Sequence, residues 1–529
     1  MSSLRLAFFL TAAGVCLVSL AARAPLIDPD EGLHAAIAQE MLLRHDYVTP
    51  TFLGEPFLDK PILFFWTEAA SLAAFGMDET AVRLPPLLFG LFGACTVALL
   101  GAALFEPRAG YAAGIAYATM LLPVGVSEVA VHDVALVPFL VLSCLGIWRI
   151  AHGGRLMPWT IVVGACLGLS ILTKGLVGVA FAGLFGLAVV AFDRRALPRL
   201  IVAGIASAAI AVLVAAPWYV AMERAHPGYL HYYFVERHVQ GYFTATQRHA
   251  GRGWWYYVPI VLGGALPWLP FAIAGSSDAA AARSRRVVWT WFFAGLTFLS
   301  AGESKLATYV LPVFPAIAME IGRSLAASSA RSGWSKARYS LFVLTCALLP
   351  VVAAAAFIWR FPASTSGHAG AMAAVTTVIV VAGYAGSRQR GDRRVPWMSG
   401  IAFVSFAAII LLVLPRAARW MTARDLATIL NGRTSLPPRV LVFDERIGSV
   451  IFYLSPDLRR EAAPDRFADA TLADVFQRLN TLPPTALLAV RADQLPRVQR
   501  LFTAPLTPDA QSGVYSVFSV ATLRHAADQ

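Results

Sequence analysis

Long apolar segments recur through most of this chain and constrain its fold more than any other feature. Most are about 17 to 22 residues long, the length at which an α-helix crosses about 30 Å of hydrocarbon. The chain has 529 residues, of which 58% are hydrophobic and only 14% are charged, so it is too apolar for a soluble protein of this size. The sequence therefore predicts an all-α polytopic membrane protein. About thirteen spans are expected, near residues 6–22, 84–104, 110–127, 134–150, 158–173, 176–192, 200–216, 256–273, 288–302, 306–322, 340–358, 371–387 and 397–414.

Basic residues orient these predicted spans. They form short clusters in alternate connections, as cytoplasmic loops do, so the net charge of +12 reflects membrane orientation and not nucleic-acid binding. The clusters place the N-terminus in the cytoplasm and the acid-rich connection at residues 24–83 on the outer side. Pro25 should block cleavage after the signal-like Ala22-Arg23-Ala24, so residues 6–22 are expected to remain as the first span.

The composition changes to that of a soluble domain after Arg416. We therefore predict a membrane domain over residues 1–415 and a small α/β domain over residues 416–529. An odd number of spans from a cytoplasmic start places this second domain outside. Four runs of strand-forming residues are separated by polar segments of helical character, namely 439–444, 449–454, 485–490 and 513–520.

The outer connection begins with a polar motif, Asp28-Pro29-Asp30-Glu31. It has the form of a helix start, with Asp28 as the N-cap and Glu31 in the capping-box position. An apolar residue then recurs at every fourth position, which predicts an amphipathic helix against the membrane surface. One interpretation is structural: Asp30 and Glu31 complement the helix dipole, worth about 0.3 to 1 kcal/mol.

Lys60 adds a second polar feature to this connection. It stands between Asp59 and Pro61, just before the aromatic run 64–66. A lysine in such a place is often a solvated or snorkelling charge. A lysine fixed by proline beside acids also forms an anion site next to a base, so this connection is a candidate catalytic loop.

Several motifs together resemble the bacterial branch of glycosyltransferase family 39, which includes the lipid A aminoarabinose transferase and relatives of the protein O-mannosyltransferases. The similarity runs in order through about residues 6–325, whereas the C-terminal 200 residues match only in architecture. The motifs are Asp30-Glu31, Gly54-Glu55, Asp59-Lys60-Pro61, Ala81-Val82-Arg83-Leu84-Pro85, Leu172-Thr173-Lys174-Gly175, Ala216-Pro217-Trp218-Tyr219, His238 with Gln240, Trp254-Trp255-Tyr256-Tyr257, Leu266-Pro267-Trp268 and the segment 304–312.

The resemblance implies a C-type glycosyltransferase fold and transfer of a sugar from a polyprenyl phosphate donor, such as undecaprenyl phosphate, to an acceptor. The acid pair Asp30 and Glu31 and a second acid, Asp133, are the catalytic candidates, with Asp30 orienting or deprotonating the acceptor. Candidate donor-phosphate ligands are Lys60, Lys305, Tyr309 and His238. Each of three residues could also have a role that involves no ligand. Asp133 could be a charge at the membrane boundary, Tyr309 an aromatic-belt residue and His238 a solvated loop residue.

The chain departs from the family pattern at several positions. Leu33 and His34 stand where the family often has arginine and an aromatic residue, and Asp59 replaces the glutamate before the lysine. Gly241 replaces an arginine that commonly follows the loop histidine and glutamine, so one phosphate-binding cation is missing. Its possible replacements are Arg237, Arg248 and Arg252.

These observations predict a transferase of the bacterial inner membrane that modifies a lipid A-like envelope glycolipid on the periplasmic face. The runner-up acceptor is a protein hydroxyl, as in protein O-mannosyltransferases. A lipid or sugar transporter is the rival from another class, but the informative charges lie at the outer boundary and not at midspan. A third hypothesis is a non-catalytic envelope scaffold, whose function would not require Asp30 or Lys60.

No metal motif is present and no cofactor is implied, and the five cysteines all lie in apolar segments.

Overall fold

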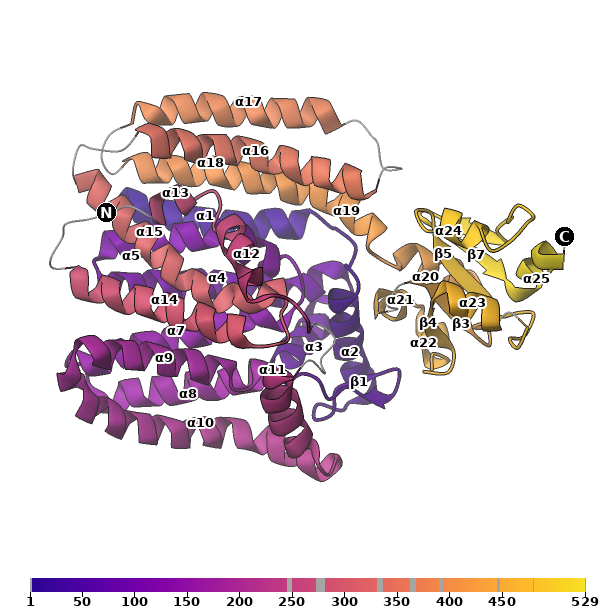
Figure 1. Ribbon diagram of the computed structural model, residues 1–529, viewed down its shortest axis with the longest axis horizontal. Coiled ribbons are helices and arrows are strands. Elements are labelled where there is room, and N and C mark those ends of the chain that lie inside the picture. The colour runs from indigo at the N-terminus through magenta and orange to yellow at the C-terminus, as the bar shows by residue number, and fades with distance from the viewer. Residues whose placement is uncertain are drawn as a thin grey trace.

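A computed structural model describes residues 2–244, 250–272, 281–330, 336–361, 368–389, 393–444, 448–478 and 480–528. Its helices lie side by side in one large body, and the C-terminal sheet forms a separate lobe at one end of that body (Figure 1). The chain is therefore a mostly helical, multi-pass membrane protein with a C-terminal α/β domain, as the sequence predicts.

Nine helices of the described residues are long and apolar enough to cross a membrane, or ten if one bent pair is a single span. Many large apolar side chains on the outside of these helices are exposed, as expected for helices that contact lipid. The spans are α1 (Ser2–Ala21), α4 (Glu79–Leu104), α7 (His132–Ala151), α8 (Leu156–Lys174), α10 (Leu197–Ala225), η4 (Ala307–Val313) with α15 (Phe314–Ala330), α16 (Lys336–Arg360), α17 (His368–Ser387), and α18 (Arg394–Ala408) continued by η7 (Ile409–Val413) and α19 (Leu414–Trp420).

Four predicted segments are not among these nine helices. Segment 110–127 is the bent pair α5 (Pro107–Ala118) and α6 (Leu121–Ser127), with an angle of 61°. Segment 256–273 is divided among η3 (Trp254–Tyr256), α12 (Tyr257–Gly264) and α13 (Leu269–Ala272), with Pro267 in the break. Proline has no backbone N–H to donate to a helix hydrogen bond, so it interrupts the helix. Hydropathy does not predict this interruption. The other two are α9 (Val177–Phe192), which is short, and α14 (Ala282–Ala301), which begins with several arginines.

The outer connection is compact and helical. It consists of α2 (Asp30–Arg44), the hairpin β1 (Thr51–Phe52) and β2 (Glu55–Pro56), and α3 (Leu63–Phe75). Leu53 and Gly54 form the hairpin turn with φ angles of 56° and 83°, a left-handed conformation that glycine adopts without cost. Ile37 and Met41 of α2 are buried against Ile62 of the same connection and Trp218 of α10, so this helix packs in the protein core and not on the membrane surface.

The C-terminal domain has a five-stranded mixed sheet with the order β4-β3-β5-β7-β6. Residues 449–454 were predicted as a strand, and this prediction is wrong, because they lie in helix α21. A short apolar run fits a buried helix as well as a strand, and packing against α2 decides here. The strands are β3 (Val440–Phe443), β4 (Phe467–Ala470), β5 (Leu487–Arg491), β6 (Ala510–Ser512) and β7 (Tyr515–Ser519), and the helices are α20 (Arg424–Asn431), α21 (Gly448–Tyr453), α22 (Pro456–Arg460), α23 (Leu472–Arg478), α24 (Leu495–Gln499) and α25 (Val520–Asp528).

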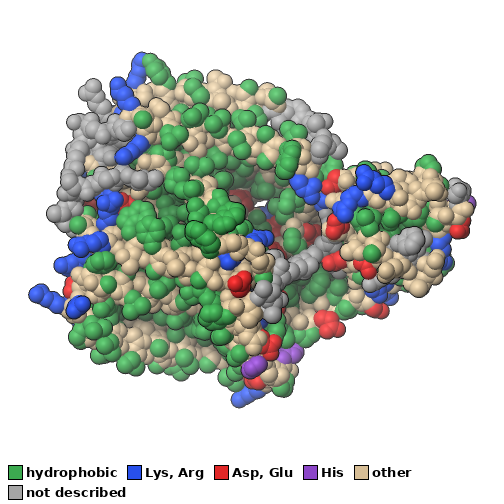
Figure 2. Space-filling view, in the orientation of Figure 1, with side chains coloured by type: hydrophobic (Ala, Val, Ile, Leu, Met, Phe, Trp, Pro, Cys, Tyr) green, Lys and Arg blue, Asp and Glu red, His purple; other side chains and the backbone are tan. Residues whose placement is uncertain are grey.

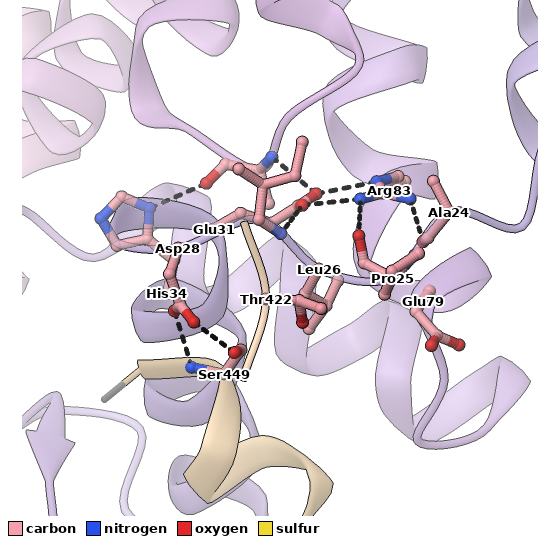
Figure 3. Close-up of polar contacts among 12 residues, drawn as sticks. Ala24, Pro25, Leu26, Asp28, Glu31, His34, Glu79, Arg83, Thr422 and Ser449 are labelled. Carbon is pink, nitrogen blue, oxygen red and sulfur yellow. Dashed lines mark hydrogen bonds and ion pairs between the residues drawn. The ribbon is translucent and has the colours of Figure 1, made fainter. Parts of the chain in front are cut away.

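Helix α21 joins the C-terminal domain to the outer connection. Gly32 and Gly448 allow the two backbones to touch, since a Cβ atom on Gly448 would clash with the backbone nitrogen of Leu33. The carboxylate of Asp28 accepts hydrogen bonds from the backbone N–H of Ser449 (2.8 Å) and from its hydroxyl (Figure 3). Asp28 is therefore not the N-cap of α2, as was predicted; α2 starts after Pro29 without a side-chain cap.

This contact is expected to depend on pH through Asp28. Burial raises the pKa of the Asp28 carboxyl to about 7, above that of an unfolded aspartate, so the folded state binds the proton more tightly. The contribution of Asp28 to stability therefore falls as pH rises through the window from about 4 to 7. We expect hydrogen exchange in α21, corrected for the intrinsic rate, to be faster at pH 8 than at pH 6. Asp28→Asn should remove this difference, and an unchanged difference in the variant would contradict the assignment.

Candidate active site

A cavity of about 590 Å³ lies between the outer connection, the start of α7, η4 and the C-terminal domain. The helical body contributes Asp30, Lys60, Asp133 and Tyr309 to its wall, and the edge strand β4 contributes Asp469. Acidic side chains gather on the surface where the helical body meets the C-terminal lobe (Figure 2). Residues separated by more than 400 positions in the sequence thus form one site.

Four of the seven residues that the sequence proposes as functional line this cavity: Asp30, Lys60, Asp133 and Tyr309. Asp30 is exposed at the first residue of α2, and Lys60 is half-buried. Among the described residues, neither side chain has an ion pair or hydrogen bond. An unpaired carboxylate and an unpaired ammonium in one cavity wall can both bind groups of a ligand.

Asp133 has a partner that the sequence did not indicate. Lys174, at the last residue of α8, forms an ion pair with the Asp133 carboxylate. The Lys174 ammonium also lies 4.1 Å from the centroid of the Tyr309 ring, a cation–π contact. Lys174 therefore contacts two wall residues of the cavity, and its ion pair with Asp133 suits a positioning role for that carboxylate better than the role of a base.

His34 is a wall residue that the sequence marked only as a departure from the family pattern. It lies one helical turn after Asp30, so both side chains fall on the same face of α2. Burial lowers the pKa of His34, and its Nδ1 is 2.8 Å from the carbonyl oxygen of Ala130. The neutral ring donates its Nδ1 proton there, which leaves Nε2 as a hydrogen-bond acceptor. The i, i+4 spacing from Asp30 was the signal that could have identified it.

Glu31 does not line the cavity, and its side chain points toward Arg83 (Figure 3). Its side chain is fully buried and forms a two-pronged ion pair with Arg83, with distances of 2.9 Å from Nε and 2.7 Å from Nη2. It also accepts hydrogen bonds from the backbone N–H groups of Ile27 (2.7 Å) and Ala130 (3.3 Å). A carboxylate so fully bonded holds the loop before α2 in place and is not positioned to react.

Lys305 and His238 also lie outside the cavity wall. The Lys305 ammonium donates to the carbonyl oxygens of Arg252 (3.1 Å) and Gly302, and its side chain is buried. His238, in η2 (His231–Gln240), bonds to the Tyr233 carbonyl with its Nδ1 (2.7 Å). In this conformation neither side chain faces a ligand in the cavity.

Of the three possible replacements for the arginine missing at Gly241, Arg237 lines the cavity. It lines the cavity from η2, four residues before Gly241, and forms an ion pair with Asp59 at 3.0 Å. Tyr232 donates its hydroxyl to the same carboxylate at 2.7 Å. Of the other two candidates, Arg252 places its guanidinium over the Tyr256 ring, and Arg248 lies outside the described residues.

No three metal-binding side chains come together anywhere in the part of the chain that the structure describes. The charged wall residues can contact a ligand directly. A cation at Lys60 suits an anionic oxygen of a ligand, and the carboxylates suit hydroxyl or amino groups.

Parts of the chain are similar to known sugar transferases. Residues 59–220 match the family described as dolichyl-phosphate-mannose-protein mannosyltransferase. An undecaprenyl phosphate-alpha-4-amino-4-deoxy-L-arabinose arabinosyl transferase of Aeromonas salmonicida (strain A449) is 31% identical over 308 residues, 57% of this chain and 56% of the relative. The protein of that name from Pseudomonas aeruginosa (strain PAO1) is 31% identical over 307 residues, 56% of this chain and 55% of the relative. The chain thus aligns with about half the length of these relatives.

The fold comparison extends over nearly the whole chain. The crystal structure of ArnT from Cupriavidus metallidurans bound to undecaprenyl phosphate is similar with a TM-score of 0.75, covering 97% of each chain at 21% identity. The apo structure of the same protein has a TM-score of 0.75, covering 98% of this chain and 97% of that one at 22% identity. Residues 59–220 are therefore similar to the dolichyl-phosphate-mannose-protein mannosyltransferase family, and the whole chain has the fold of ArnT.

Proposed function

We propose that this protein is an integral membrane glycosyltransferase that moves 4-amino-4-deoxyarabinose from undecaprenyl phosphate to a lipid A-type glycolipid. The observation that carries the proposal is one cavity that holds an unpaired carboxylate, Asp30, and an unpaired ammonium, Lys60, in the fold of ArnT. Transfer from a lipid phosphate needs both charges. The cation stabilises the departing phosphate, and the carboxylate orients the acceptor.

The roles of the wall residues follow from their contacts. Lys60, with Arg237 nearby in the wall, receives the phosphate oxygens of the donor. Asp30 deprotonates a hydroxyl acceptor, or only positions an acceptor phosphate, which is already ionised near neutral pH. Asp133, held by Lys174, binds hydroxyl groups of a sugar. Glu31 is a positioning residue, since it touches Arg83 and backbone groups and not the cavity.

The charge of the cavity favours an amino sugar as the transferred group. Asp30, Glu55 and Asp469 line it without an ion pair among the described residues, whereas Lys60 is the matching unpaired base. A donor with one phosphate and one ammonium group balances Lys60 and a carboxylate together. Mannosyl transfer to a protein hydroxyl, the activity in the family description, is the second candidate, but a neutral sugar leaves the carboxylates uncompensated.

We propose that the cavity opens on the periplasmic side of the bacterial inner membrane. Basic side chains gather at the end of the helical body opposite the C-terminal lobe (Figure 2), which matches the positive charge of cytoplasmic loops. The N-terminus is then cytoplasmic. Residues 1–415 form the membrane domain with its outer loop at 24–83, and residues 416–529 form a periplasmic domain that covers the cavity.

Transfer of radiolabelled sugar from a polyprenyl-phosphate donor pool tests this proposal. We expect wild-type membranes to place label in the glycolipid fraction and Asp30→Asn to lower the rate at least about 100-fold, within the range that general base catalysis contributes. The matched control is Asp457→Asn, an exposed aspartate of α22, which should transfer normally. Label in the protein fraction would indicate the mannosyltransferase-like reaction. Label that is indifferent to Asp30→Asn would contradict the assigned site.

A further inference from the structure

A second cavity, of about 770 Å³, lies on the side of the helical body along α14, where none of the residues discussed above for transfer is found. Its wall combines arginines with aromatic side chains: Arg285, Arg286, Trp289, Phe293 and Arg323. Hydrophobic side chains cover the part of the body where Figure 1 shows α14, and basic side chains lie at the end away from the C-terminal lobe (Figure 2). The groove is therefore basic at one end and apolar along its length.

The exposed face of α14 has a basic residue near one end of the helix and aromatic residues further along. Arg286, Thr290, Phe293 and Thr297 are all exposed and follow one another at spacings of four, three and four residues, which places them on one side of the helix. Trp289 stacks on Phe293 with ring centroids 5.6 Å apart and planes at 26°. One helix face thus presents a charged head region followed by a flat apolar surface.

The basic end carries more positive than negative charge. The fully buried carboxylate of Glu320 is shared by two guanidinium groups, Arg285 (3.0 Å) and Arg323 (2.6 Å). Arg286 adds a third, and its contacts are the Phe192 ring at 5.3 Å and the Ala282 carbonyl at 3.4 Å. Among the described residues, no carboxylate pairs with Arg286, so its charge is not balanced there. Placing excess charge beside apolar surface is costly unless an anion balances it.

We propose that this groove binds an anionic phospholipid of the surrounding membrane. Arg285 and Arg286 hold the phosphate of the headgroup, and Trp289 and Phe293 pack against the acyl chain. Basic pockets between transmembrane helices bind anionic headgroups in this way. A free phosphate ion would pair with the arginines but would not contact the aromatic side chains. The arginines and the aromatic side chains together therefore favour an anion with an apolar tail. This inference does not depend on the transferase reaction.

Lipid binding to the purified full-length protein tests the inference. Native mass spectrometry would compare phosphatidylglycerol, phosphatidylcholine and soluble glycerol phosphate as ligands. We expect phosphatidylglycerol to bind at least about ten-fold more tightly than either, because only it offers a net negative headgroup together with acyl chains. Equal binding of phosphatidylcholine would overturn the charge argument. Equal binding of glycerol phosphate would show a simple anion site and overturn the lipid assignment.

Two variants and one matched control locate the site. Arg286→Gln lies outside the Glu320 network, so folding is expected to be preserved, and it should weaken phosphatidylglycerol binding about ten-fold, as the loss of a charge-assisted contact does. Phe293→Ser should weaken lipid binding without altering glycerol phosphate binding. Arg283→Gln removes an arginine of the same helix end that pairs with Asp193 and does not line the groove. If Arg283→Gln weakens binding as much as Arg286→Gln, general surface charge and not this groove attracts the lipid.

Discussion

Replacing Lys60 with alanine is expected to lower sugar transfer by a factor of about 100 to 1000, the loss typical when one donor to a developing oxyanion is removed. Lys60 lines the cavity, and no described residue pairs with its ammonium group. Its charge is therefore available to an anionic ligand, which we propose is the donor phosphate. The thermal stability of the detergent-solubilised protein should stay nearly unchanged, because the substitution removes no hydrogen bond or ion pair among the described residues. Initial rates at saturating acceptor, measured against donor concentration, would check the prediction.

Two control variants make this prediction specific. Lys336→Ala removes an exposed lysine at the start of α16 and should leave the rate unchanged. Lys60→Arg keeps the positive charge with a different shape and should retain part of the activity, since the two cations present their donors differently. If Lys60→Ala transfers sugar at a rate within about three-fold of wild type, Lys60 does not stabilise the transition state. Such a rate difference corresponds to less than about 1 kcal/mol.

Replacing Arg83 with methionine is expected to destabilise the protein by about 3 to 5 kcal/mol, the cost of leaving a buried charge without its partner. Arg83 is 4% exposed and forms two hydrogen bonds with Glu31, which is fully buried. Its remaining N–H groups bond to the carbonyl oxygens of Ala24 and Pro25. The variant should also lose transfer activity, because these contacts fix the chain just before Asp30. Thermal unfolding in detergent and the transfer assay would measure the two effects.

A partly exposed ion pair provides the control for Arg83. Arg44 and Glu40 are 3.4 Å apart at the end of α2, and the Arg44 side chain is 47% exposed, so Arg44→Met should cost at most about 1 kcal/mol. Adding Glu31→Gln to Arg83→Met should recover part of the stability, because the unpaired charge is then gone. The buried-pair assignment is wrong if Arg83→Met and Arg44→Met shift the unfolding temperature equally, or if the double variant is no more stable than Arg83→Met.

The membrane fold could be predicted because lipid imposes a simple rule. A helix that crosses the bilayer needs a long apolar segment, and such segments are visible in the sequence. Asp30 and Lys60 could be proposed for a related reason, since they stand in a polar connection between apolar segments. Bends were less visible: α5 and α6 form one continuous apolar stretch in the sequence yet meet at 61°.

The direction of individual side chains could not be predicted. Lys60 and Lys305 have similar local contexts and both matched family motifs, but only Lys60 lines the cavity, whereas Lys305 bonds to backbone carbonyls. Asp28 had the spacing of an N-cap, yet its carboxylate bonds to Ser449, more than 400 residues away. Local patterns specify which groups are present, while distant neighbours decide which of them are already bonded.

The sequence by itself determined the apolar spans, the polar outer connection and the residue types needed for transfer from a lipid phosphate. The tertiary structure alone decided which of these groups meet. In the folded chain Asp133 pairs with Lys174, 41 positions away, and Glu31 pairs with Arg83. The edge strand of the C-terminal sheet lines the cavity. The physical reason is that hydropathy is a property of each segment, whereas an ion pair or a cavity wall requires two or more segments to pack in one particular way.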